Sequence, residues 1–265
     1  MPSRTFTVCT LNTWKCDGRY RDRLELMTAE ACRLRPDILL LQEAFAAPSL
    51  GLDTAAHLAR ALGYGFAVAP ARAKPRLFEG AAVDSVSGLA VLSRGDIRSS
   101  RTVPLSDDAR DGERISQVVE LVLDGLRLLL VNMHLVYLPD CDDLRRVEME
   151  ETFAALPPLD DYDAAILAGD FNCAPDSAPI RWLLEESGLR IADACAAAGA
   201  DFITREQGST RPAMRMDDIF LLETGKESRF RVDRVERVFQ TPDPTLGILP
   251  SDHYGVLATL ERRSG

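Results

Sequence analysis

Short apolar runs separated by polar loops recur along the whole chain, and the first two enclose a segment with helical spacing. The runs TFTVCTLN at 5–12 and DILLLQE at 37–43 are typical of β-strands. Apolar residues recur at helical spacing between them: Leu24, Met27, Ala31 and Leu34. Pro36 then closes the helical segment. The chain is therefore predicted to open as a β-α-β unit.

The remaining runs predict more strands than helices. Further strands are expected at 65–69, 88–92, 116–123, 126–132, 164–168, 217–222 and 254–260. Helices are expected near 54–62, 142–155 and 177–187. Asp124 and Gly125 supply the positive φ that a tight hairpin turn requires, so the strands on either side of them are predicted to pair. This mixture of hairpins and crossovers suits an α/β fold in which two packed sheets are covered outside by helices.

The chain is long enough to bury a large core without disulfides or a structural metal. It has 265 residues, of which 46% are hydrophobic. No linker, repeat or charge block divides it, so we expect one domain over residues 1–265. The six cysteines lack the spacing of a zinc or disulfide framework. We find neither a leader pattern at the N-terminus nor an apolar run of membrane-spanning length, and therefore expect a soluble, cytoplasmic protein without a transmembrane segment.

The net charge argues against a protein that coats nucleic acid. At pH 7 the formal charge is −10, so a long polyanion is repelled at a distance unless basic residues gather on one face. A small or singly bound phosphoester depends far more on the local charges of its site. Nucleic acid is therefore a possible but disfavoured partner.

Polar side chains stand at the ends of the apolar runs. The set comprises Glu43, Asn132, His134, Asp170, Asn172, Asp252 and His253. Each alone has an ordinary explanation, because Asp and Asn are frequent in turns and a histidine is usually a satisfied packed or surface residue. The joint pattern is harder to explain in this way, since two of the three histidines belong to it. Catalytic groups are often placed on strand-end loops of a rigid scaffold, so we expect these residues to converge.

Six short motifs, in order, resemble the endonuclease/exonuclease/phosphatase superfamily. They are LNTW with Asn12, LQE with Glu43, NMHL with Asn132 and His134, GDFN with Asp170 and Asn172, RMDDIF with Asp217, and SDHYG with Asp252 and His253. SGLAVLSR at 87–94 is similar to an internal segment of that family. The resemblance runs from residue 8 to residue 256. It implies a four-layered α/β sandwich that hydrolyses a phosphoester with Mg²⁺, for which Mn²⁺ is a possible substitute.

The chemistry of phosphoester hydrolysis suits these residue types. The reaction needs an in-line water, a base, and positive charge or donors around the oxygens. Mg²⁺ prefers oxygen ligands and is typically held by one or two carboxylates plus the substrate phosphate. Glu43, with Asn12 nearby, meets this preference, and the resemblance adds Asp252, pointing toward the metal or the polar network beside it. Adjacent strand residues point to opposite sides, so Asp252 and His253 are expected to do different jobs.

The resemblance also implies roles for the catalytic candidates. Asp170 would orient or deprotonate the attacking water, and Asn172 would bind the phosphate oxygen that gains charge. His253 is similar to the family's essential imidazole, with Asp217 as the carboxylate that fixes its tautomer and raises its basicity. His134 would donate to the scissile phosphate. The sequence leaves open whether His253 or Asp170 takes the proton of the water.

Two details distinguish the branches of the family. Where the abasic-site DNA-repair branch tends to carry Asp in its first motif, this chain has Trp14, and a histidine motif occupies the middle of the chain. Both features are similar to the sphingomyelinase, DNase, deadenylase and inositol-phosphatase branches. Asp218 competes with Asp217 as the histidine partner, and the spacing from Arg215 favours Asp217.

Basic and amide side chains offer candidates for substrate contact. Arg114 and Arg215 carry the guanidinium fork that matches phosphate oxygens, although both could equally be structural ion-pair partners. Asn132 of the NMHL motif is the third candidate. The segment RAKPR at 72–76 is expected to be an exposed charged loop, with a phosphate-facing rim as the alternative.

Three hypotheses follow from the sequence. The favoured one is a Mg²⁺-dependent phosphodiesterase, because every chemical position holds the residue type that the mechanism needs. A phosphomonoesterase acting on a small phosphorylated metabolite or inositol phosphate is the alternative. A catalytically silent scaffold is disfavoured, since none of the catalytic positions has been lost. No protein partner is implied.

Overall fold

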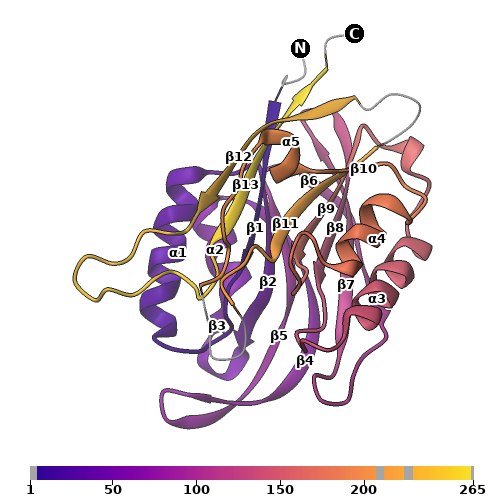
Figure 1. Cartoon of the computed structure of the whole chain (residues 1–265). Helices are drawn as coiled ribbons and strands as arrows, with labels where there is room; N and C mark the ends of the chain where they lie inside the picture. Colours follow the sequence, from indigo (N-terminus) through magenta and orange to yellow (C-terminus); the bar gives the residue numbers. More distant parts are fainter. Residues whose placement is uncertain (1–4, 207–211, 224–228, 264–265) are drawn as a thin grey trace.

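Two β-sheets pack face to face and carry helices on their outer surfaces (Figure 1). The computed structural model describes residues 5–206, 212–223 and 229–263. Figure 1 shows α1 (Tyr20–Leu34) and α2 (Thr54–Leu62) on one side of the strands, and α3 (Asp142–Ala154) and α4 (Ala178–Glu185) on the other. The result is the four-layered α/β sandwich that the sequence predicted.

The first sheet is built around the N-terminal strand. Its seven strands are, in spatial order, β12 (Phe230–Val238), β13 (Gly255–Arg262), β1 (Thr5–Asn12), β2 (Ile38–Ala47), β5 (Ala81–Ser93) and β4 (Gly65–Phe78), with β3 (Leu52–Asp53) paired to β2. β1 and β2 are parallel, as a β-α-β opening requires, and the other pairs are antiparallel.

The second sheet is built from the middle of the chain. Its six strands are, in spatial order, β10 (Ile191–Asp193), β11 (Asp217–Leu222), β9 (Ala164–Asp170), β8 (Leu126–His134), β7 (Arg114–Leu123) and β6 (Asp96–Leu105). β8 and β9 are parallel. The hairpin predicted between β7 and β8 is confirmed, with Asp124 and Gly125 at φ 50° and 82°. The short helix α5 (Ala194–Ala198) and the 3₁₀ turns at Pro48–Leu50 and Leu159–Asp161 complete the elements.

The alternation of side chains along the strands separates three layers of core. In β2, Ile38 and Leu40 lie in the core between the sheets, whereas Leu39 and Leu41 pack under α1 and α2. Strands of the second sheet divide in the same way between the inner core and the core beneath α3 and α4. Both faces of these strands are buried, which explains why the sequence shows continuous apolar runs there.

Toward one end of the inner core, the same alternation brings in polar residues. On three strands, a polar residue lies two positions beyond the inner-core apolar residue that is nearest to this end. These polar residues are Asn132 on β8, Asp170 on β9 and Asp217 on β11. Gln42 follows Leu40 in the same way on β2. The strand faces that carry the apolar residues of the inner core therefore carry amides and carboxylates at one end of the space between the sheets.

Several predictions about elements were wrong. β6 and β12 were not predicted, because both carry many charged or exposed residues and lack a clear apolar run. The segment 72–76 is not a loop but part of β4, which continues into a long hairpin with β5. Glu43 does not follow the end of a strand: it lies inside β2 at a β-bulge, with φ 53°. Among the described residues, no helix combines the length and apolarity needed to cross a membrane.

Candidate active site

A cavity of about 230 Å³ opens at the polar end of the inter-sheet core. Eight of the predicted site residues line it: Asn12, Glu43, Arg114, His134, Asp170, Asn172, Asp252 and His253. They come from both sheets and from the loop before β13. The expected convergence of residues far apart in the sequence is therefore present in the fold.

Parallel pairing of β8 and β9 places two of these residues side by side. His134 is the register partner of Asp170 at the end of the ladder. The residue before Asp170 is Gly169, with φ 149°, and a Cβ there would lie 2.0 Å from the Met133 carbonyl oxygen. Only glycine lets the two backbones approach this closely, so Gly169 fixes where the Asp170 carboxylate enters the cavity.

The Asp170 carboxylate is held by one hydrogen bond to each oxygen. Its Oδ2 accepts a hydrogen bond from Asn12 Nδ2 at 2.9 Å, which joins the two sheets. Its Oδ1 accepts a hydrogen bond from the backbone N–H of Asn172 at 2.9 Å, and Asn172 has the left-handed φ of 52°. The Asn172 side chain donates to the Leu135 carbonyl at 3.0 Å. These bonds leave Asp170 with a fixed orientation at the cavity wall.

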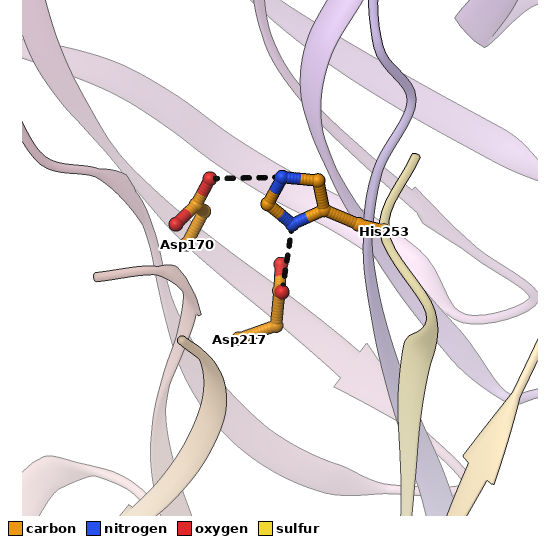
Figure 2. A group of neighbouring side chains, drawn as sticks. All are labelled: Asp170, Asp217 and His253. Carbon is orange, nitrogen blue, oxygen red and sulfur yellow. Dashed lines mark hydrogen bonds and ion pairs between the residues drawn. The ribbon is translucent and has the colours of Figure 1, made fainter. Parts of the chain in front are cut away.

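His253 lies between two carboxylates (Figure 2). Its Nδ1 is 2.8 Å from Asp217 Oδ2, and its Nε2 is 4.0 Å from Asp170 Oδ2. Burial disfavours the imidazolium, but Asp217 and Asp170 outweigh it and raise the pKa of His253 to about 10. Burial raises the pKa of Asp217 to about 6, while the charged His253 opposes that rise. At neutral pH the two residues therefore form an ion pair, with Nε2 directed toward Asp170.

His134 has the opposite electrostatic environment. Its Nε2 is 3.5 Å from Asp170 Oδ2 and 3.9 Å from Glu43 Oε1. Burial, together with the positive charges of Arg114 and Lys15, holds the pKa of His134 well below its usual value. The neutral imidazole can donate one hydrogen bond without carrying charge. The cavity thus contains one charged and one neutral histidine.

Two buried carboxylate oxygens of the cavity lining test whether a metal fits. They are Glu43 Oε2 and Asp252 Oδ1, and both residues line the cavity. The other Asp252 oxygen, Oδ2, accepts a hydrogen bond from Arg205 at 3.0 Å. Glu43 Oε2 has Lys15 Nζ at 2.9 Å, whereas Asp252 Oδ1 has no hydrogen-bond partner among the described residues. Carboxylate oxygens are the ligands that a hard divalent cation prefers. The residues present therefore fit a Mg²⁺-type ion.

Asn12 contributes to this metal site less directly than the sequence suggested. Its Nδ2 is committed to Asp170, and its Oδ1 accepts a hydrogen bond from the Trp14 backbone N–H at 3.0 Å. Of the Asn12 amide, the second lone pair of Oδ1 remains available to bind a metal.

Two other groups of three possible metal ligands also lie close together. Ligand atoms of Asp170, Asp217 and His253 lie within 4.8 Å of one another, as do those of Asp193, Cys195 and Asp218. In the first group, Asp217 already binds His253 Nδ1. In the second, both aspartates pair with Arg215. Donor atoms of both groups are therefore already paired within the chain.

Two arginines share one carboxylate at the opposite wall of the cavity. Arg114 Nε donates to Asp111 Oδ2 at 2.8 Å, and Arg72 Nη1 donates to Asp111 Oδ1 at 3.0 Å. All three residues line the cavity. Two guanidinium groups on one carboxylate leave a net positive charge in this part of the cavity lining.

The comparisons with known proteins agree with this geometry. A model of the endonuclease/exonuclease/phosphatase family matches residues 9–253. This chain belongs to that family. Members of the family are metal-dependent phosphodiesterase hydrolases, so the chain is a metal-dependent phosphoesterase. No curated protein gives a significant match.

Solved structures with the same fold share little sequence with this member of the endonuclease/exonuclease/phosphatase family. A family protein from Beutenbergia cavernae is 21% identical with a TM-score of 0.72, covering 98% of this chain and 72% of that chain. A family protein from Leptotrichia buccalis is 17% identical with a TM-score of 0.73, covering 97% and 99%. D. rerio TDP2, complexed with single-strand DNA product, is 17% identical with a TM-score of 0.71, covering 98% and 100%.

Three predicted residues of this family member lie outside the cavity lining. Asp217 reaches the site only through His253. Asn132 is fully buried between the sheets, where its side chain bonds Gln42 at 2.7 Å and the Leu41 carbonyl at 3.0 Å. Arg215 is paired with Asp193 and Asp218. Both side chains are used in structural contacts, and for Arg215 this is the ion-pair alternative that the sequence left open.

Among the lining residues that the sequence did not single out are Lys15, Asp111, Tyr137 and Arg205. For the segment 72–76, Arg72 lines the cavity, as the alternative of a phosphate-facing rim expects. The residue belongs to strand β4 rather than to a loop. Asp252 and His253 do not alternate as strand neighbours, because β13 begins only at Gly255 and both side chains line the cavity. Lys15 had one signal: it directly follows the LNTW motif in a chain with three lysines.

Proposed function

We propose that this chain is a Mg²⁺-dependent phosphodiesterase, with Mn²⁺ as a substitute, that cleaves a small phosphodiester by in-line attack of an activated water. The observation that carries the proposal is the placement, in one cavity, of the Glu43 and Asp252 carboxylates near the His253–Asp217 pair. One side supplies ligands for a hard cation, and the other supplies groups that move a proton.

Each side chain has a role that its contacts support. Asp170, fixed by Asn12 and by the Asn172 N–H, orients or deprotonates the attacking water. His253 stands 4.0 Å from the same carboxylate and exchanges a proton with it or with the leaving oxygen. Asn172 and neutral His134 donate to phosphate oxygens. A metal bound by Glu43 and Asp252 would supply positive charge to the phosphate.

The division of proton transfer between Asp170 and His253 follows from their charges. The Asp217 carboxylate favours imidazolium, so His253 suits the protonation of a leaving oxygen, and Asp170 suits the deprotonation of water. A metal near Glu43 would weaken this preference by adding positive charge to the cavity. The two groups therefore act as a coupled pair, and the pH profile of the reaction belongs to both.

A phosphomonoesterase is the second candidate. Four basic side chains line the cavity: Lys15, Arg72, Arg114 and Arg205. A monoester carries more charge than a diester and would use more of these donors. Nucleic acid is a weaker candidate substrate, because the net charge of −10 repels a polyanion, although a neighbour of similar fold was solved with single-strand DNA product. We expect the protein to act in the cytoplasm without a dedicated protein partner.

A hydrolysis panel tests the proposal. With Mg²⁺, we expect turnover of bis-p-nitrophenyl phosphate over p-nitrophenyl phosphate, plasmid DNA, RNA and sphingomyelin, and loss of turnover with EDTA. His253→Ala should lower kcat by about 100-fold or more, the usual contribution of a positioned acid or base. His57→Ala, on α2 outside the cavity lining, is the matched control. Preferred turnover of the monoester would select the second candidate, and full activity of His253→Ala would refute the proposed mechanism.

A further inference from the structure

Lys15 places an ammonium group beside the proposed metal ligand. Its Nζ lies 2.9 Å from Glu43 Oε2 and 3.7 Å from Asp17 Oδ2, and the residue lines the cavity. The chain has three lysines against 31 basic residues in all, so this is a rare side chain in an arginine-rich protein.

The backbone that carries Lys15 is clamped by one buried arginine. Arg23 is 2% exposed, and its guanidinium donates to the carbonyls of Thr13, Trp14, Lys15, Asp17 and Pro250. It also stacks 4.8 Å from the Trp14 ring. Trp14 and Lys15 both adopt positive φ, at 55° and 40°, which costs conformational energy that these bonds offset. The loop is therefore held in one shape.

The same clamp joins two parts of the site. Pro250 precedes the Asp252–His253 segment, so Arg23 ties the loop after β1 to the loop before β13. With its backbone fixed, Lys15 can change partner only by rotating its flexible side chain. That motion keeps the ammonium close to the cavity.

The position of Lys15 conflicts with a metal on Glu43. The ion pair with Lys15 Nζ at 2.9 Å already neutralises the Glu43 carboxylate at its buried Oε2. An ammonium 2.9 Å from this oxygen and a divalent cation on the same oxygen would repel each other strongly in a buried site. Lys15 must leave Glu43 when the metal arrives.

We propose that Lys15 is a catalytic residue that changes partner: its ammonium rests on Glu43 in the metal-free protein and moves to a non-bridging oxygen of the substrate phosphate when the metal is bound. The inference rests on the proposed function, because it takes Glu43 as a metal ligand. In the metal-free protein Lys15 holds the Glu43 carboxylate in place and neutralises it. In the loaded protein it adds a fourth kind of donor around the phosphate, beside Asn172, His134 and Arg114.

The phosphate is the best remaining partner for the displaced ammonium. Asp252 Oδ2 is already bonded to Arg205, and Asp17 is half exposed, so its attraction is weakened by water. Lys15 and His134 line the same cavity, so the ammonium lies among the groups that would surround the phosphate. A compact ammonium with three rotatable donors suits a partner change better than a rigid guanidinium fork.

Opposite changes in two affinities test the proposal. Lys15→Met removes a cation that competes with the metal, so Mn²⁺ affinity without phosphate, measured by electron paramagnetic resonance or calorimetry, should rise about tenfold. The same variant lacks a phosphate contact, so the affinity for inorganic phosphate in the presence of Mn²⁺ should fall about tenfold. A merely structural role would weaken both.

Two further variants control the measurement. Lys15→Arg keeps the charge and should return the Mn²⁺ affinity toward that of the unmodified chain. Lys74→Met, an exposed lysine of β4 outside the cavity lining, should leave both affinities unchanged. Unchanged or weaker Mn²⁺ binding by Lys15→Met, or unchanged phosphate binding, would overturn the proposal. Failure of the unmodified chain to bind Mn²⁺ would instead count against the proposed function itself.

Discussion

Asp217 and Asp218 are neighbours in the sequence with unrelated partners. Both are fully buried in β11, and successive strand residues face opposite sides of the sheet. Asp217 faces the inter-sheet layer and binds His253 at 2.8 Å. Asp218 faces outward and lies 2.7 Å from Arg215 Nε. Strand alternation therefore decides which aspartate binds the His253 imidazole.

Glu148 is a buried carboxyl that lies beneath the segment following His134. It is 0% exposed on α3, its Oε2 accepts the Val136 N–H at 3.0 Å, and its Oε1 has no hydrogen-bond partner among the described residues. Burial raises the pKa of Glu148 to about 8, even though Arg114 and Arg145 lower it. The folded state thus binds a proton that the unfolded chain releases at lower pH. The stability from this proton is complete below the unfolded pKa near 4.5 and is lost as pH rises through about 8.

Replacing Glu148 with glutamine should remove this pH dependence. The amide resembles the protonated acid and keeps an acceptor for the Val136 N–H. We expect the free energy of unfolding of Glu148→Gln to fall less steeply than that of the unmodified chain between roughly pH 5 and pH 8, by up to about 1.4 kcal/mol per pH unit. Denaturant titrations at several pH values measure it. Glu150→Gln, exposed on the same helix, should leave the slope unchanged, and parallel curves for Glu148→Gln would contradict the prediction.

The pairing of β8 with β9 depends on one missing side chain. A Cβ on Gly169 would meet the Met133 carbonyl oxygen at 2.0 Å, and its φ is 149°. We expect Gly169→Ala to lower the free energy of unfolding by about 2–4 kcal/mol through overpacking and strain, and to reduce activity because Asp170 is displaced. Chemical denaturation and the diester assay measure the two effects.

Gly63 provides the control for the backbone contribution. It ends α2 with φ 74°, and a Cβ there would meet nothing within 4 Å. Gly63→Ala should therefore cost only about 1 kcal/mol, from the positive φ alone. Equal losses in the two variants would show that the close approach of β8 and β9 is not limiting.

A β-bulge in β2 sets the direction of the Glu43 side chain. Leu41 pairs with Ala90 and Ala44 pairs with Gly88, so two residues of β2 oppose one residue of β5. The bulge gives Glu43 a left-handed φ and turns its carboxylate into the cavity, while Gln42 stays between the sheets. A regular strand would send Gln42 and Glu43 to opposite faces.

At the scale of the molecule, polar contacts join the two sheets beneath the cavity. Gln42 of the first sheet donates to Asn132 Oδ1, and Asn132 donates to the Leu41 and Ala90 carbonyls across the interface. Gln117 lies 3.5 Å from Asn132 Nδ2. These bonds satisfy buried amides and fix how the sheets sit against each other. The cavity is therefore supported from below by contacts that apolar packing would not specify.

The acidic charge of the molecule predicts how salt affects different substrates. With a net charge of −10, long-range repulsion should slow encounter with an oligonucleotide more than with a small diester. Raising NaCl from about 20 to about 150 mM screens this repulsion. We expect the ratio of kcat/KM for a single-stranded oligonucleotide to that for bis-p-nitrophenyl phosphate to rise a few-fold. A falling ratio would indicate a basic nucleic-acid surface, whose binding weakens with salt.

The sequence by itself determined the main strands and helices and the residue types of the site, and the family resemblance supplied the four layers. Apolar runs long enough to bury both strand faces require a sheet covered on each side, and helical spacing supplies the covers. Strand-end polar residues then point to one shared end of the sheets. The charged, half-exposed strands β6 and β12 were not predicted, because they pair with neighbouring strands without having an apolar run of their own.

Only the tertiary structure decided which of these residues face the cavity. Asn132 and His134 lie on the same face of β8, yet one is buried between the sheets and the other lines the cavity, because two residues advance a strand by about 7 Å. Arg114 faces the cavity, whereas Arg215 is paired with Asp193 and Asp218. Partners of charged and amide groups come from distant parts of the chain, and their positions are set by the packing of the two sheets rather than by local spacing.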